Sequence, residues 1–202
     1  MARRQTNTGE SPTVHTVLIS TPLDMWLKLL WDFRVFRNIQ ASYPDDQQPL
    51  VYASINVCIA SSSLEDYVML DRPVGMQRES VRSKIRAAVP NSGVLRDIAN
   101  TAKHASHREE YWTGGKVVLR WQDSSEDGPS TFVLEHEHRG EQTVVALTAF
   151  ENCVSDWWKL LVELGLASGP KPVPEWYQRE LRAMFSGVPE LQSPGFPDQN
   201  NY

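Results

Sequence analysis

The sequence predicts a mainly helical α+β protein, a bundle of four or five helices with a three-stranded antiparallel β-meander before the last core helix. Apolar side chains recur every three to four residues over most of residues 22–110, which is the period of an α-helix. Between residues 116 and 148 the period changes to two, which is typical of strands. Of the 202 residues, 41% are hydrophobic and 22% are charged, a composition typical of a folded globular chain.

The expected helices are recognised by their ends as well as by their period. Thr21, Pro22 and Asp24 place a capping hydroxyl, a proline and a carboxylate where the exposed N–H groups of a first helix begin. Six helices follow from these patterns, at about residues 22–41, from Pro49 to about Leu70, from Val81 to Pro90, 94–110, 149–164, and a short one at 175–185.

The strands and the prolines set the expected organisation of the chain. We expect strands at 117–121, 131–138 and 143–148, separated by turns at 123–128 and 139–140. Residues 1–20 are expected to form a flexible arm, because they are mostly polar. Residues 21–166 are expected to form one domain with the meander at 116–148, and residues 167–202 a proline-rich extension with one short helix.

Charge and cysteine content exclude several classes of function. A net charge of −5 and a pI near 5.5 argue against extensive binding of duplex DNA, because each phosphate contact needs a cation. The sequence has no apolar run of the roughly 18 residues that a membrane span needs. Cys58 and Cys153 lie in apolar helical patterns without metal-ligand spacing. We therefore expect a cytoplasmic protein that binds no cofactor and does not contact membranes.

The fourth helix carries the most informative polar pattern. At 100° per residue, one face is apolar and the opposite face is polar. The apolar face is formed by Leu95, Ile98, Ala102 and Ala105. The polar stripe is formed by Arg96, Asn100, Lys103, His104 and His107. This stripe is either a binding surface or the solvated face of an amphipathic helix.

The Asn100-x-x-x-His104 spacing resembles the end of the Arg-polar-x-x-x-His motif of the HEPN superfamily, whose active members are metal-independent ribonucleases of toxin and defence systems. The resemblance covers about residues 22–110. It implies a helical bundle that works as a dimer, with His104 in the place of the family histidine. Ala99 stands where the family has its arginine, and an alanine cannot stabilise the charge of a cleavage transition state. The Asp-x-Ala-Asn-x-x-Lys-His string also resembles uncharacterised bacterial and phage helical proteins, which implies a degenerate, non-catalytic relative.

Three hypotheses on function follow. The first is a non-enzymatic binding or assembly protein of phage or bacterial defence, with a protein partner or a second copy, or with RNA. The second is a metal-independent ribonuclease with a rearranged site of Arg96, Asn100 and His104. The third is a metal-dependent hydrolase, because period two places His136 and His138 on one face of a strand. We expect no bound metal, since two ligands do not make a site.

The seven tryptophans could form stacking platforms for single-stranded nucleic acid. Core packing explains most of them better, because they fall on apolar faces. Trp112 and Trp176 are expected at the surface. Trp158 aligns with Val154 and Leu161 and is expected in the core, with Trp157 at its boundary.

Overall fold

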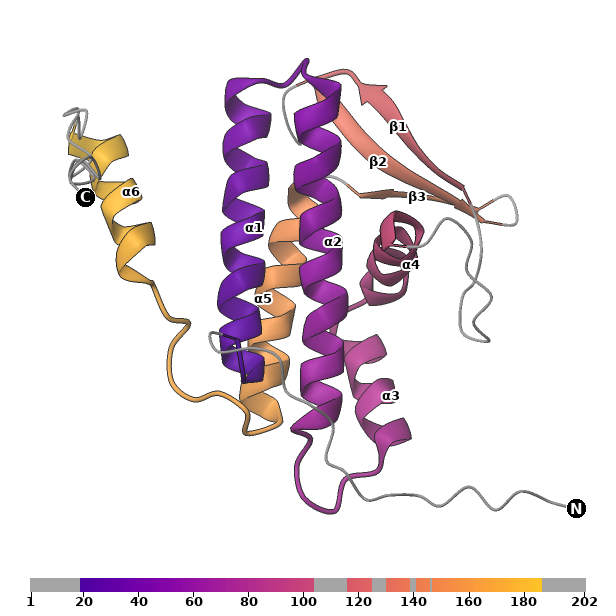
Figure 1. The fold of residues 1–202 in the computed structure, drawn as a ribbon, viewed down its shortest axis with the longest axis vertical. Helices are drawn as coiled ribbons and strands as arrows, with labels where there is room; N and C mark the ends of the chain where they lie inside the picture. The colour runs from indigo at the N-terminus through magenta and orange to yellow at the C-terminus, as the bar shows by residue number, and fades with distance from the viewer. Residues whose placement is uncertain (1–18, 104–115, 125–129, 139–140, 146, 187–202) are drawn as a thin grey trace, which may run out of the picture. The chain divides into compact units, whose positions relative to one another are not determined.

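The structure is a computed structural model that describes residues 19–103, 116–124, 130–138, 141–145 and 147–186 (Figure 1). It confirms a mainly helical α+β chain with antiparallel strands before a later helix. The arm expected at residues 1–20 lies almost entirely outside the described residues.

Most elements lie close to the positions expected from the sequence. The helices are α1 (Pro22–Ser42), α2 (Gln47–Leu70), α3 (Arg78–Ala88), α4 (Ser92–Lys103), α5 (Leu147–Glu163) and α6 (Glu175–Ser186). The strands are β1 (Lys116–Gln122), β2 (Thr131–His138) and β3 (Glu141–Val145). The third strand was expected to reach Thr148, which was wrong because α5 already begins at Leu147. The continuation of α4 to Glu110 lies outside the described residues.

The start of α1 is a capping box, as its sequence indicates. Thr21 Oγ1 accepts a hydrogen bond from the Asp24 N–H at 3.1 Å, and the Asp24 carboxylate accepts one from the Thr21 N–H at 3.0 Å. Each group thereby satisfies an N–H that the helix leaves free. A further hydrogen bond from the Ser20 backbone is the largest of the effects that lower the pKa of Asp24 below its ordinary value.

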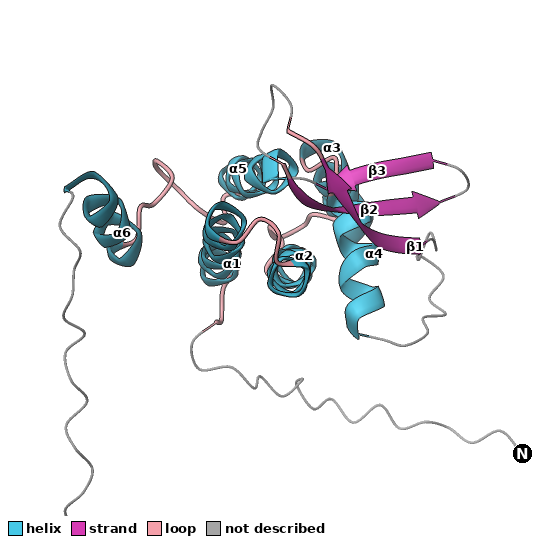
Figure 2. Cartoon of the chain, turned by 90° about the horizontal axis from the view of Figure 1, so that it is seen from above, coloured by secondary structure: helices cyan, strands magenta, loops and turns pink. Residues whose placement is uncertain are grey.

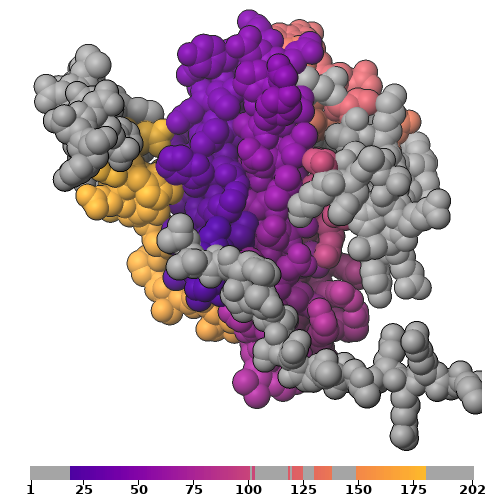
Figure 3. Space-filling view, in the orientation of Figure 1, coloured from indigo at the N-terminus to yellow at the C-terminus, as the bar shows by residue number. Residues whose placement is uncertain are grey.

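α1 and α2 are antiparallel neighbours, and α5 packs behind them (Figures 1 and 2). Their outer surfaces lie side by side on one face of the molecule (Figure 3). The buried indole of Trp26 donates its N–H to the Val154 carbonyl at 3.0 Å, which joins α1 to α5. Several small residues of α2 are buried, among them Ala53, Ser54 and Ala60, and such side chains let a neighbouring helix approach closely.

Both tryptophans of α5 lie in the core, so the expected boundary position of Trp157 is wrong. Trp157 is 0% exposed and Trp158 is 9% exposed. The two side chains point in different directions, yet both are covered because α5 contacts α1 and α2 as well as α3 and β3. The Trp158 ring packs against Trp26 with centroids 4.8 Å apart.

Two of the remaining tryptophans are more exposed than the sequence suggested. Trp31 on α1 and Trp121 on β1 are 51% and 40% exposed. Trp176, expected at the surface, is half-buried in α6. Trp112 lies outside the described residues.

The strands form one antiparallel sheet in the order β1-β2-β3 (Figure 2). Glu135 at the middle of β2 pairs with Val118 of β1 on one side and Val144 of β3 on the other. The sheet is attached to α1 by a hydrogen bond of 3.2 Å, which Gln40 Nε2 donates to Thr131 Oγ1.

The chain divides into two compact units, one that ends at Ser168 and one that begins at Gly169. Within the second unit, α6 follows a proline-rich segment. The Trp176 and Tyr177 rings meet edge to face at 5.8 Å, and Gln178 Nε2 donates a hydrogen bond to the Val173 carbonyl.

Candidate functional site

The candidate site is built around α4, the helix that carries Arg96 and Asn100 of the predicted polar stripe. Leu95, Ile98 and Ala99 are buried, and α4 packs against α2. Ala102, expected on the apolar face, is exposed instead, whereas Ala99 is 0% exposed. The buried face of α4 therefore includes Ala99 and excludes Ala102. One side of this helix packs against α2, and Asp97 contacts His136 of the sheet.

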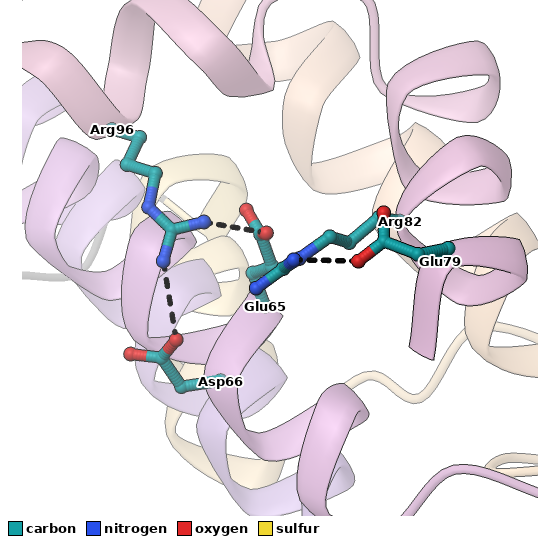
Figure 4. Close-up of polar contacts among 5 residues, drawn as sticks. All are labelled: Glu65, Asp66, Glu79, Arg82 and Arg96. Carbon is teal, nitrogen blue, oxygen red and sulfur yellow. Dashed lines mark hydrogen bonds and ion pairs between the residues drawn. The ribbon is translucent and has the colours of Figure 1, made fainter. Parts of the chain in front are cut away.

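Arg96 is engaged in ion pairs with α2. Its guanidinium forms an ion pair of 2.6 Å with Glu65 and one of 3.4 Å with Asp66, both on α2 (Figure 4). The Glu65 side chain is only 11% exposed, and that of Arg96 is 34% exposed. Because a carboxylate this deeply buried needs a partner, Arg96 anchors α4 to α2.

A separate ion pair lies within α3. Arg82 Nη1 is 2.8 Å from Glu79 Oε1, three residues earlier on the same helix (Figure 4). Glu65 and Asp66 lie on α2, Glu79 and Arg82 on α3, and Arg96 on α4. Each of the two arginines is thus paired with a carboxylate.

Other members of the predicted stripe are placed only in part. Asn100 is half-buried on α4, and Lys103 is the last described residue of that helix. His104 and His107 lie outside the described residues. The grouping of Arg96, Asn100 and His104 into one site therefore stays a prediction.

A second polar contact joins the neighbouring residue of α4 to the sheet. Asp97 Oδ2 lies 3.8 Å from Nε2 of His136 on β2, and both side chains are buried. Leu134, two residues before His136 and therefore on the same face of the strand, is also buried. Asp97 was assigned no role from the sequence, because its partner His136 lies on a strand that is distant in sequence.

The other face of β2 is also covered. Glu135 lies on the face opposite to Leu134 and His136, because successive residues of a strand alternate in direction. Its side chain is only 8% exposed. It accepts a hydrogen bond of 2.6 Å from Arg120 Nε on β1. The side chain of His138, the other proposed metal ligand, is not described. Within the described residues no three His, Cys, Asp or Glu side chains are grouped as metal ligands would be.

The serines and cysteines of the core are unsuited to nucleophilic catalysis. Ser61 accepts a hydrogen bond of 2.9 Å from the Trp157 indole and lies 3.4 Å from the Cys153 sulfur. Burial raises the pKa of Cys153 to about 12 and that of Cys58 well above its ordinary value. Thiols with such pKa values stay protonated at neutral pH and are poor nucleophiles.

Comparisons with family models, with curated proteins and with solved structures found no match. In the part of the chain that the structure describes, no helix combines the length and the apolar character that a bilayer span requires.

Proposed function

We propose that this protein is a non-catalytic binding and assembly protein built on a degenerate HEPN-like bundle. The observation that carries the proposal is the engagement of Arg96, the one arginine within α4. Its charge is balanced by Glu65 and Asp66. A role in phage or bacterial defence follows from the resemblance alone.

The argument depends on what RNA cleavage without a metal requires. A cation must lie next to the scissile phosphate and stabilise the charge that develops in the transition state. Ala99 stands at the position of the family arginine and is 0% exposed. Arg96 is paired with two carboxylates, and these would repel a phosphate brought to the same guanidinium. Neither residue is therefore suited to stabilise the charge of the transition state.

A metal-independent ribonuclease is the second candidate. It is favoured by the partial exposure of Arg96, whose side chain keeps 34% of its surface accessible. In that case, Arg96 would exchange its carboxylate partners for a phosphate when RNA binds, with Asn100 and His104 beside it.

Cleavage assays in EDTA separate the two candidates. Single-stranded RNA and transfer RNA are incubated with wild type, Arg96→Ala, His104→Ala and the control Arg86→Ala, which removes an exposed arginine of α3. Our proposal expects the same background in all four samples. Cleavage by wild type and Arg86→Ala that is lost in the other two variants would overturn it.

A binding assay on the same samples addresses RNA as a partner. The anisotropy of a fluorescent single-stranded RNA is measured against protein concentration at two salt concentrations. Binding without cleavage supports a binding protein and identifies RNA as a partner. Absence of binding leaves a protein partner or a second copy as the expected ligand.

A further inference from the structure

We draw no further inference here: the strongest candidate, the basic surface patch of α3 that carries the exposed Arg78 and Arg86, supports no proposal, because nothing in the part of the chain that the structure describes shows what covers it.

Discussion

The contacts of α5 with α1 and α2 differ in kind from those of α4 with α2 and β2. The first group is dominated by apolar burial, with Trp26 and Trp157 each 0% exposed and each donating one indole hydrogen bond. The second group includes charged contacts, in which Arg96 meets α2 and Asp97 meets β2.

The difference has an energetic consequence. Apolar burial has no preferred direction and scales with the area removed from water, so it stabilises without fixing one geometry. A buried charge fixes the position of its partner, because moving the partner away leaves the charge uncompensated. We infer that the α5 contacts supply most of the stability and that the charged contacts determine where α4 lies.

The largest effect is expected from the α5 contacts. Trp157→Ala should lower the free energy of unfolding by about 3–5 kcal/mol, because it removes a fully buried ring and the hydrogen bond to Ser61. Trp158→Ala should cost a similar amount. Trp31→Ala, which removes a tryptophan that is 51% exposed, is the matched control and should cost less. Urea denaturation measures all three, and a neutral Trp157→Ala would contradict this assignment of the core.

A smaller effect is expected from the charged contacts of α4. Arg96→Ala should cost about 1–3 kcal/mol, because it leaves the Glu65 carboxylate buried without this partner. The control Arg86→Ala removes an exposed arginine and should change the stability by less than about 0.5 kcal/mol. Equal midpoints for the two variants in urea would show that the ion pairs contribute nothing.

The helix cap of α1 should contribute less than either group. Thr21→Ala removes the hydroxyl that accepts from the Asp24 N–H and should cost about 1 kcal/mol. Ser83→Ala, at an exposed position of α3, is the control and should be nearly neutral. The melting temperatures of the two variants are measured by circular dichroism. Equal melting temperatures would contradict a stabilising contribution from the Thr21 cap.

The smallest effect concerns pH and distinguishes two carboxylates of α1. The pKa of Asp24 is lowered in the folded state, chiefly by the hydrogen bond from the Ser20 backbone, so its contribution to stability is present above its ordinary pKa of 3.8. That contribution is lost as the pH falls through the lowered value. The stability difference between wild type and Asp24→Asn should therefore shrink in acid.

Asp32 provides the opposite case, because burial raises its pKa despite the nearby Lys28. A carboxyl with a raised pKa stabilises the fold most when it is protonated, and this contribution is lost as the pH rises through the raised value. Asp32→Asn should therefore gain stability relative to wild type between acid and neutral pH. Urea denaturation at several pH values measures both trends, and parallel curves for the two variants would contradict the assignment.

The local elements could be read from the sequence, whereas the contacts between them could not. The bounds of β2 follow from its alternation and those of α1 from its capping box, both of which are local patterns. Asp97 looks like a surface residue until β2 is placed against α4. Glu135 is buried for a similar reason, since its partner Arg120 lies on another strand. Trp157 was misplaced because the partners that cover the second side of α5 are distant in sequence.

The measurement that tests the central claim most directly is a double-mutant cycle between Arg96 and Glu65. The claim is that Arg96 holds α4 on α2 rather than serving an active site. Stabilities of wild type, Arg96→Ala, Glu65→Ala and the double variant give the coupling energy. We predict a favourable coupling of about 1–2 kcal/mol. A coupling indistinguishable from zero would contradict the claim and leave Arg96 available for another role.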